Sequence, residues 1–304
     1  MGMFDVADKS DTLRTAVAQA IVNVSSETVR LIKAGKSPKG DIAEAARIAA
    51  TMGAKKTSDL IPYCHPIPLD YIHIDVTLKE VSIEIHAELK TIWKTGVEME
   101  ALTAVSIAAL TVYDMLKPID KTLSIGSIHL LQKIGGIKGV QEKYERSLRA
   151  GVLVVSDSVS VGEREDMSGK LAVEILEKYG FIVGSCGVVS DDAEQIEAEL
   201  RQFCDELKLD LVVTCGGTGF GPRDVTAEAT SRVVDRETRG VSEVLRAYGQ
   251  RRTPTAMLSR GVSGVRGHSV IVNLPGSPKA VSEGLAALFP GILHIYRMLE
   301  GHGH

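Results

Sequence analysis

Two ionisable side chains at the end of a long apolar stretch have a spacing that suits acid–base chemistry. Asp114 and Lys117 are three positions apart, so they share one face of a helix. A carboxylate beside an ammonium group orients it and changes its proton affinity, which general acid–base catalysis uses. The same spacing also fits an ordinary surface ion pair, worth under about 1 kcal/mol. Lys39, just before an expected helix start at Asp41, could bind phosphate together with the free N–H groups of that helix.

A second group of candidate residues lies where prolines exclude a continuing helix. Pro62 and Pro66 bracket the dipeptide Cys64-His65. His65 could act as a general acid or base or as a phosphate ligand, and a purely structural histidine explains the pattern at least as well. A zinc site is a poor interpretation, because this half of the chain has no second cysteine.

Two acidic residues, Glu98 and Glu100, stand at the start of the long apolar stretch. A capping box with Thr95 as N-cap and Glu98 at its third position explains Glu98 without a functional role. It explains Glu100 less well, so a role in ligand binding stays open for that residue.

In the second half, small, polar or acidic loops follow each of four expected strands. The segment Gly216–Asp224 is rich in glycine, which lets backbone N–H groups approach phosphate oxygens. Ser168 and Ser277 are placed as helix N-caps, so those helix starts can also face an anion. Asp191 and Asp224 offer the oxygen ligands that Mg²⁺ takes beside phosphates and water.

Each of these signals has a simpler explanation when taken alone. Asp191 and Asp192 could merely cap the next helix, and Gly276-Ser277-Pro278 could be only a turn before a helix. The glycine run is neither a dinucleotide fingerprint nor a Walker A loop. All four loops follow expected strands, and doubly wound sheets bind ligands beyond the carboxyl ends of their strands. Their joint placement therefore favours one crevice for an anionic ligand with a metal.

The helices and strands expected in the first half of the chain, which must position Lys39, Asp114 and Lys117, indicate an α+β domain. Apolar residues at helical spacing favour a helix over 10–31, and a second helix is expected over 41–52, capped by Asp41 and followed by Gly53. Alternating residues predict an antiparallel hairpin of strands 72–78 and 81–89. A helix over 97–116 then ends before Pro118. We expect a ferredoxin-like antiparallel sheet over residues 1–137, followed by a linker over 138–148.

The rest of the chain, residues 149–304, alternates strand and helix. We expect strands at 151–156, 181–189, 209–215 and 269–274, and helices at 168–179, 192–207, 226–238, 240–249 and 278–288. This alternation predicts a doubly wound α/β domain of three layers with a mostly parallel sheet.

Composition narrows the class of protein. The 304 residues include 35 Lys and Arg against 39 Asp and Glu, a net charge of −4, which argues against a general nucleic-acid binder. The four cysteines form no CxxC pair, so disulfides are not expected. Neither a signal peptide nor an apolar run long enough to span a bilayer is evident, so we expect a cytoplasmic protein that does not contact membranes.

The first half resembles the MoaC family, cyclic pyranopterin monophosphate synthase, over about residues 3–136. The resemblance rests on Asp5-Val6, Lys39-Gly40-Asp41, Asp59–Pro62, Cys64-His65-Pro66, Lys94–Ala104, Tyr113-Asp114-Met115, Lys117 and Lys133 before Gly135-Gly136. Members of that family convert a GTP-derived cyclic intermediate, made by a radical-SAM partner, into a cyclic phosphate pterin with loss of diphosphate. A histidine that often precedes the Lys39 position in the family is replaced here by Ser37-Pro38.

This resemblance implies roles for individual residues. Lys117 and Asp114 become the leading catalytic pair, with His65 and Lys39 also catalytic. The same site would bind substrate through Arg14, Lys55, Cys64, Glu98, Met99, Glu100 and Lys133. The family forms hexamers with sites at subunit interfaces, which implies a homo-oligomer whose pockets draw residues from two chains. It implies no tightly bound cofactor in this half.

The second half resembles the molybdopterin-binding MoaB/MogA family over about residues 148–300. The resemblance rests on Gly216–Gly219, Gly221–Thr226, Asp235-Arg236-Glu237, Ser259-Arg260-Gly261 and Asn273–Lys279. In its adenylyltransferase members, AMP passes from ATP·Mg²⁺ to the terminal phosphate of molybdopterin, and members are trimers or hexamers. Asp191 and Asp224 match the two acidic positions of that branch, although Asp191 follows Ser190 where a proline often stands.

The resemblance implies that the catalytic and metal-binding residues are Asp191 and Asp224. The implied ligand-binding residues are Ser168, Gly169, Gly216, Gly217, Thr218, Gly219, Pro275, Gly276 and Ser277. Three interpretations follow: a bifunctional enzyme, an enzyme fused to a pterin-binding or scaffolding module without turnover, and a nucleotide-binding regulator. Two independent sets of motifs point to one pathway, so the first is preferred. The two steps are not consecutive, so channelling between the halves does not follow.

Overall fold

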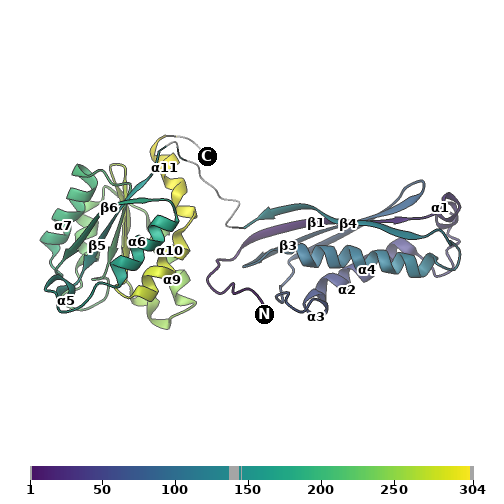
Figure 1. Ribbon diagram of the computed structural model, residues 1–304, viewed down its shortest axis with the longest axis horizontal. Helices are drawn as coiled ribbons and strands as arrows, with labels where there is room; N and C mark the ends of the chain where they lie inside the picture. Colours follow the sequence, from purple (N-terminus) through teal and green to yellow (C-terminus); the bar gives the residue numbers. More distant parts are fainter. Residues whose placement is uncertain (1, 137–143, 145, 302–304) are drawn as a thin grey trace. The chain divides into compact units, whose positions relative to one another are not determined.

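The computed structural model describes residues 2–136, 144 and 146–301 and divides the chain into two compact units. Unit 1 is Met1–Gly139 and unit 2 is Val140–His304 (Figure 1). The predicted linker falls largely on residues 137–143 and 145, which lie outside the described residues.

Unit 1 is one antiparallel sheet with helices packed on one of its faces. In chain order its elements are β1 (Thr12–Asn23), α1 (Ser26–Lys33), α2 (Ile42–Lys55), α3 (Thr57–Leu60), β2 (Tyr71–Leu78), β3 (Ser82–Trp93), α4 (Glu98–Leu116) and β4 (Ser124–Gly135). The strand order is β2-β3-β1-β4, and every neighbouring pair is antiparallel. The expected antiparallel sheet is thereby confirmed, including the hairpin of β2 and β3.

The helix predicted over 10–31 is wrong, because most of that segment is the central strand β1. Ala16, Ala18, Ala20 and Val22 are buried while the residues between them face outward, a period of two rather than 3.6. The small alanines allow α4 to lie close above the strand. Sequence reasoning gave weight to larger residues spaced like a helix and overlooked the alternating alanines. Strand β4 was missed as well.

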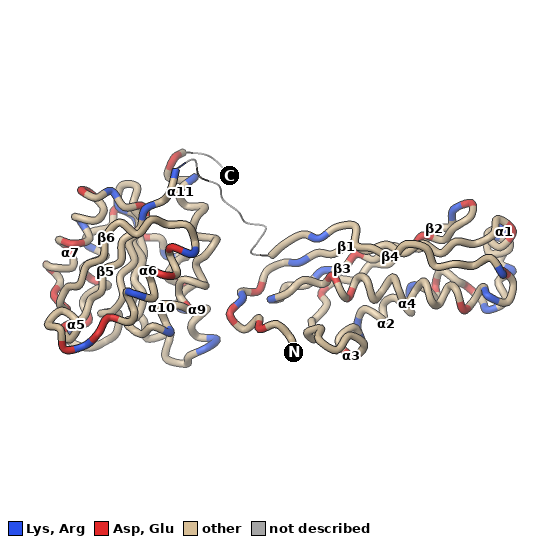
Figure 2. Tube along the Cα trace, viewed as in Figure 1, with Lys and Arg blue, Asp and Glu red and all other residues tan. Residues whose placement is uncertain are grey.

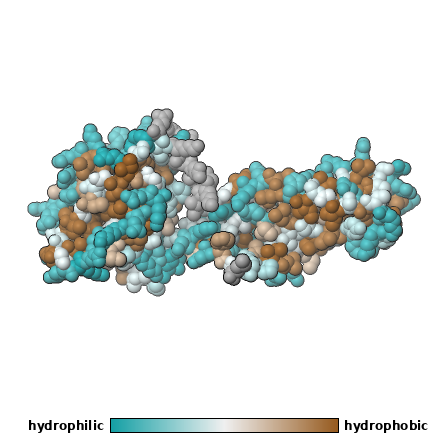
Figure 3. Space-filling model, in the orientation of Figure 1, coloured by the Kyte–Doolittle hydropathy of each residue, from teal (hydrophilic) through white to brown (hydrophobic). Residues whose placement is uncertain are grey.

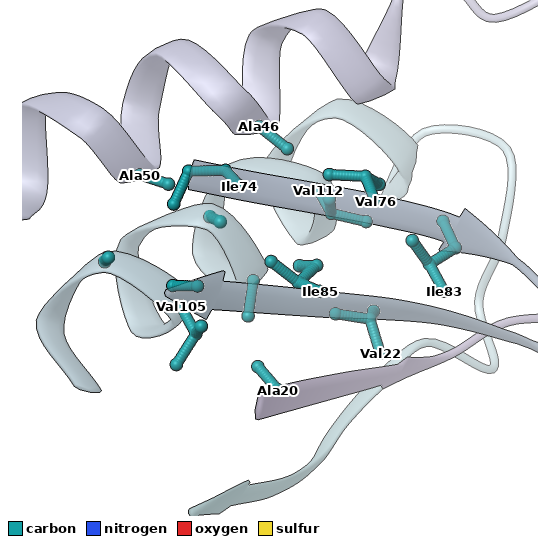
Figure 4. Close-up of a cluster of buried hydrophobic side chains, with 14 of the residues drawn as sticks. Ala20, Val22, Ala46, Ala50, Ile74, Val76, Ile83, Ile85, Val105 and Val112 are labelled. Atoms are coloured by element: carbon teal, nitrogen blue, oxygen red, sulfur yellow. The ribbon is translucent and has the colours of Figure 1, made fainter. Parts of the chain in front are cut away.

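The core of unit 1 lies between this sheet and helices α2 and α4. Figure 4 shows part of it, with side chains from three strands and both helices: Ala20, Val22, Ile74, Val76, Ile83, Ile85, Ala46, Ala50, Val105 and Val112. Asp41 caps α2 as predicted, its side chain accepting a hydrogen bond from the backbone N–H of Glu44 at 3.0 Å. The helix does not stop before Gly53, because this glycine is where α2 meets Ile107 of α4.

Helix α4 is the long buried helix of unit 1. Its length and composition alone would allow it to cross a membrane, contrary to expectation, but over half of its apolar window is buried within the unit. It begins after Val97 without a side-chain cap, so the predicted capping box is wrong. Glu98 instead forms an ion pair with Lys133 of β4.

Unit 2 is a six-stranded sheet in the order β6-β5-β7-β10-β9-β8. Its strands are β5 (Arg149–Val155), β6 (Ile182–Val189), β7 (Leu211–Cys215), β8 (Arg236–Glu237), β9 (Ser263–Arg266) and β10 (Ser269–Leu274). The first four in that order are parallel, and β9 and β8 extend the sheet in antiparallel fashion. The mostly parallel sheet is as expected, whereas the two strands that continue it in antiparallel pairs, β9 and β8, were not predicted.

Helices cover both faces of this sheet. They are α5 (Asp157–Ser160), α6 (Ser168–Lys178), α7 (Ala193–Arg201), α8 (Thr226–Val233), α9 (Arg239–Gln250), α10 (Pro278–Leu288) and α11 (His294–Leu299), with short helices at η2 (Gln202–Glu206), η3 (Pro254–Leu258) and η4 (Gly291–Leu293). One core layer contains residues of α6 and α10, and the other contains residues of α7 and α8 (Figure 1). The helix predicted over 226–238 ends early at Val233, because the chain turns into edge strand β8.

Candidate functional sites

The C-terminal end of α4 carries a carboxylate shared between two lysines. Asp114 lies 2.7 Å from the ammonium nitrogen of Lys117 and 2.6 Å from that of Lys39, which also donates to the Asp114 carbonyl oxygen at 3.1 Å. The hydrogen bonds from Lys117 and Lys39 lower the pKa of Asp114 to about 2, and the bond to Asp114 raises the pKa of Lys117. Lys117 is therefore held as a cation, and two ammonium groups beside one carboxylate suit phosphate binding.

The N-terminal end of α4 carries a different cluster, built around a buried acid. Glu100 is 2% exposed, and its Oε1 accepts from the Cys64 thiol at 3.6 Å, while its Oε2 has no hydrogen-bond partner among the residues that the structure describes. Burial raises the pKa of Glu100, and burial together with Glu100 raises the pKa of Cys64 to about 11. Cys64 is thus a thiol donor rather than a nucleophile in the free protein. An unpaired oxygen on a buried carboxyl group is the kind of atom that a ligand completes.

The other predicted residues of unit 1 lie around this same end. Arg14 of β1 donates to the Lys94 carbonyl at 3.2 Å just before α4 begins, and Lys133 forms its ion pair with Glu98. A ring nitrogen of His65 lies 2.8 Å from the Phe4 carbonyl oxygen. Of the two remaining predicted residues, Met99 lies in the first turn of α4 and is 40% exposed, and Lys55 is the last residue of α2.

Within one copy of unit 1, the predicted site residues fall into two separate groups. Glu98 and Asp114 stand 16 residues apart on one helix, which separates them by about 24 Å. The charged residues of α4 itself lie only at its two ends (Figure 2). Lys39, Asp114 and Lys117 therefore form one half-site, and the residues around Glu100 form another.

Unit 2 contains a cavity of about 930 Å³ beyond the carboxyl ends of its parallel strands. All but one of the predicted site residues of this unit line it: Ser168, Asp191, Gly216, Gly217, Thr218, Gly219, Asp224, Pro275, Gly276 and Ser277. The remaining one, Gly169, adjoins Ser168 and donates its N–H to Asp166 at 2.7 Å. The prediction that four loops share one crevice is thereby confirmed.

Asp191 and Asp224 line this cavity, and Asp157 and Arg223 form a hydrogen-bonded group with Asp191 beside it. The N–H of Asp157 donates to Asp191 at 3.0 Å, the N–H of Asp191 donates to Asp157 at 3.1 Å, and Arg223 donates to Asp157 at 2.7 Å. Burial and the nearby charges of Asp157 and Asp224 raise the pKa of Asp191. Asp157 was not among the predicted site residues, although it follows β5 as Asp191 follows β6.

These carboxylates fit a divalent cation held partly by a ligand. Among the described residues, no three His, Cys, Asp or Glu side chains gather closely enough to enclose a metal. Asp191 and Asp224 instead border the same cavity, with an oxygen of each turned toward the glycine loop. Mg²⁺ is commonly bound in this way, by one or two carboxylates plus phosphates and water. A cation here would also relieve the repulsion that disfavours ionised Asp191.

The glycine loop needs its glycines for conformation as well as for access. Gly216 has φ +117° and Gly217 has φ +63°, and a side chain at Gly216 would overlap the Val155 carbonyl oxygen. Ser277 caps α10 as predicted, accepting from the Ala280 N–H at 3.2 Å. Ser168 is not a cap, which corrects the prediction: its hydroxyl donates to the Gly276 carbonyl at 2.6 Å and so joins two cavity loops.

Comparisons with known proteins agree with this division into two sites. Residues 3–136 match the model of the MoaC family, and residues 151–294 match that of the probable molybdopterin binding domain. A molybdenum cofactor biosynthesis bifunctional protein from Chlorobaculum tepidum is 42% identical over 99% of this chain and 96% of its own length. A protein with the same name from Synechococcus elongatus is 37% identical over 99% of this chain and 98% of its own length.

A single-function relative aligns with the first half alone. The cyclic pyranopterin monophosphate synthase of Thermomicrobium roseum is 47% identical over 48% of this chain and 90% of its own length. The full-length matches have the same two halves in one polypeptide. The chain therefore belongs to the molybdenum cofactor biosynthesis bifunctional proteins, a MoaC domain fused to a MoaB/MogA-type molybdopterin-binding domain.

Proposed function

We propose that the chain catalyses two separate steps of molybdenum cofactor biosynthesis. Unit 1 converts (8S)-3′,8-cyclo-7,8-dihydro-GTP into cyclic pyranopterin monophosphate and diphosphate. Unit 2 binds molybdopterin and transfers AMP to it from ATP with Mg²⁺. The β-α-β-β-α-β order of unit 1 supports a ferredoxin-like assignment, and the helices on both faces of unit 2 support a doubly wound one.

The observation that carries the first activity is the carboxylate shared by Lys39 and Lys117. The reaction expels diphosphate from a triphosphate, so negative charge grows on the leaving group as the bond breaks. Two ammonium groups fixed 2.6 and 2.7 Å from Asp114 are positioned to neutralise that charge and to supply a proton. The buried Glu100 has one oxygen without a partner in the described part of the chain, which suits recognition of the polar edge of the guanine-derived ring.

We further propose that each unit 1 site combines the two half-sites from different subunits of a homo-oligomer, either a trimer or a hexamer. The separation of about 24 Å along α4 supports this, because one small substrate must reach both sets of residues. Exposed hydrophobic side chains support association as well. Ile48 and Met52 of α2 and Leu110 of α4 are each 55% exposed, and brown side chains gather on the face of unit 1 seen in Figure 3.

In unit 2, the cavity loops have the parts that nucleotidyl transfer requires. A terminal phosphate oxygen of molybdopterin attacks the α-phosphorus of ATP, a new P–O–P linkage forms, and diphosphate leaves with the electrons of the broken bond. Mg²⁺ bound with ATP screens the two polyanions from one another. Asp191 and Asp224 hold that ion, while the glycine loop and the loop of Gly276 hold phosphate oxygens.

The first activity is tested with the purified full chain and the cyclic GTP intermediate. We expect one diphosphate for each cyclic phosphate pterin formed. Lys117→Ala is expected to fold and oligomerise normally but to form almost no product. A chain that releases no diphosphate would instead be a nucleotide-binding regulator.

The second activity is tested with molybdopterin, ATP and Mg²⁺. We expect AMP transfer that requires Mg²⁺ and is lost in Asp224→Ala, while thermal unfolding of the variant stays close to that of the wild type. Tight binding of molybdopterin without any transfer by the wild type would identify unit 2 as a binding module.

A further inference from the structure

Arg260 makes an unusual concentration of contacts with the glycine loop of unit 2. Its backbone N–H donates to the Thr218 carbonyl at 2.8 Å. Its side chain donates through Nε to the Gly219 carbonyl at 2.6 Å and through Nη2 to the Asp224 carbonyl at 2.5 Å. The guanidinium group also forms an ion pair with Glu228 and lies 5.3 Å from the centre of the Phe220 ring. One residue thus holds both ends of the segment 218–224.

Arg260 is itself held from behind by the body of the domain. The buried Asn273 of β10 accepts from the Val262 N–H at 3.0 Å and donates to Thr214 and Thr230 at 2.9 Å each. Arg246 of α9 donates to the Gly261 carbonyl at 3.0 Å. The backbone on the C-terminal side of Arg260 is therefore fixed to the sheet and to α9, so its side chain can transmit that rigidity to the loop.

These contacts determine which polar groups of the loop face the cavity. In a trans peptide the C=O of one residue and the N–H of the next point in opposite directions. Arg260 draws the carbonyls of Thr218 and Gly219 to its own side, so the N–H groups of Gly219 and Phe220 turn the other way. Within the continuously described stretch 146–301, the cavity lining includes Gly219 but neither Phe220 nor Arg260, and the Gly219 N–H group donates to no protein acceptor.

We propose that Arg260 is a positioning residue that turns the backbone N–H group of Gly219 in the glycine loop toward the cavity, where it binds a nucleotide phosphate, and that fixes Asp224 beside it. The proposal rests on the proposed nucleotidyl transfer of unit 2. Asp224 belongs to it because Arg260 holds its carbonyl, while its carboxylate accepts from the Gly221 N–H at 2.6 Å. Released from Arg260, the same peptides can rotate and present carbonyl oxygens, which repel phosphate.

The fork of the guanidinium group is essential to this role. Its Nε and two Nη atoms bond to three different acceptors at fixed angles, which the single ammonium group of lysine cannot do. Arg260→Lys therefore keeps the charge but loses the geometry, and Arg260→Met loses both. Arg266→Met is the matched control, because Arg266 also joins a backbone carbonyl to a carboxylate but does so at Val233 and Asp205.

The direct test is amide hydrogen exchange of residues 218–224 in the full chain. We expect exchange to become at least about tenfold faster in Arg260→Lys and Arg260→Met, with Arg266→Met unchanged, because the loop is released without loss of the fold. Thermal unfolding of unit 2 shows that each variant is folded. Unchanged exchange in the folded Arg260 variants would overturn the proposal, whether or not the wild type transfers AMP.

The kinetic constants for ATP and Mg²⁺ give a second test, because general destabilisation of the fold does not change them. We expect kcat/KM for ATP to fall about 10²-fold in Arg260→Lys, as a misplacement of about 1 Å causes. The Mg²⁺ concentration for half-maximal rate should rise at least about tenfold, because Asp224 is displaced. Normal Mg²⁺ dependence and normal KM for ATP in this variant would contradict the proposal. Absence of transfer by the wild type would overturn the function of unit 2, and the exchange result would then decide the role of Arg260 alone.

Discussion

Mixing of inactive subunits tests whether the two ends of α4 belong to one shared site. The chosen changes are Lys117→Ala at the C-terminal end of α4 and Lys133→Ala beside its N-terminal end, both at exposed lysines. Each variant alone is expected to lose almost all diphosphate release. Because about 24 Å of helix separates the two ends, one subunit cannot bring both lysines to one substrate.

The expected recovery in a mixture follows from counting intact half-sites. In a random one-to-one oligomer, half of the subunits offer an intact Lys117 end and half offer an intact Lys133 end. If each site pairs the ends of two different subunits, about one quarter of the sites are complete, and about one quarter of wild-type activity returns. The assay is diphosphate release by co-expressed variants, with equal incorporation checked by mass spectrometry.

A second mixture supplies the control and the refuting result. The double variant Lys117→Ala/Lys133→Ala mixed with wild type also gives about one quarter of the activity if sites span subunits. If each site lies within one subunit, the two single variants stay inactive when mixed, and the double variant mixed with wild type gives about one half. That second pattern would refute the proposal of shared sites.

Three further predictions concern stability and pH. Gly216→Ala should destabilise unit 2 by about 1–3 kcal/mol, because its φ of +117° is strained for alanine and the new Cβ meets the Val155 carbonyl. Gly240→Ala, with open space around the new Cβ, is the control and should leave the thermal unfolding of unit 2 unchanged. Burial raises the pKa of Glu100, so the stability that its protonated form gives to the fold is lost as the pH rises through that pKa. The free energy of unfolding of Glu100→Gln should therefore exceed that of the wild type by about 1–3 kcal/mol at alkaline pH and equal it in acid. Unfolding can be followed by the fluorescence of the single tryptophan, which lies in unit 1. Burial alone would raise the pKa of Asp120, but hydrogen bonds from Ser25 and Thr122 hold that pKa well below its usual value. Asp120→Asn should therefore lower the free energy of unfolding by about 1–3 kcal/mol near pH 7, and the difference from the wild type should vanish once the pH falls below the native pKa. For Glu100 and for Asp120 alike, equal pH profiles of stability in the variant and the wild type would contradict the assignment.

Much of unit 2 could be predicted from the sequence, because its signals are local and agree with one another. Continuous apolar strands alternate with capped helices, and the rule that ligands bind beyond the strand ends gathers Asp191, Asp224 and the glycine loop into one cavity. The short strands β8 and β9 at one end of the sheet were not predicted, since two to four residues carry no periodic signal. The role of Arg260 escaped because it depends on backbone carbonyls, which have no sequence signature.

Unit 1 shows where sequence reasoning reaches its limit. The long helix and the β2–β3 hairpin follow from clear periodicity, but β1 was read as a helix because its buried face is mostly alanine. The candidate residues were identified by type and motif, and the expectation that each pocket draws residues from two chains came only from the family resemblance. The separation of these residues into two groups depends on the length of α4. The predicted capping box is wrong because Glu98 pairs with Lys133 across the fold.

The most direct test of two independent active sites in one chain is to assay both reactions on the same two full-length variants. We expect Lys117→Ala to lose diphosphate release from the cyclic GTP intermediate while it keeps Mg²⁺-dependent AMP transfer to molybdopterin. We expect Asp224→Ala to show the opposite pattern. Loss of both activities in either folded variant, or retention of the affected activity in either one, would contradict the account.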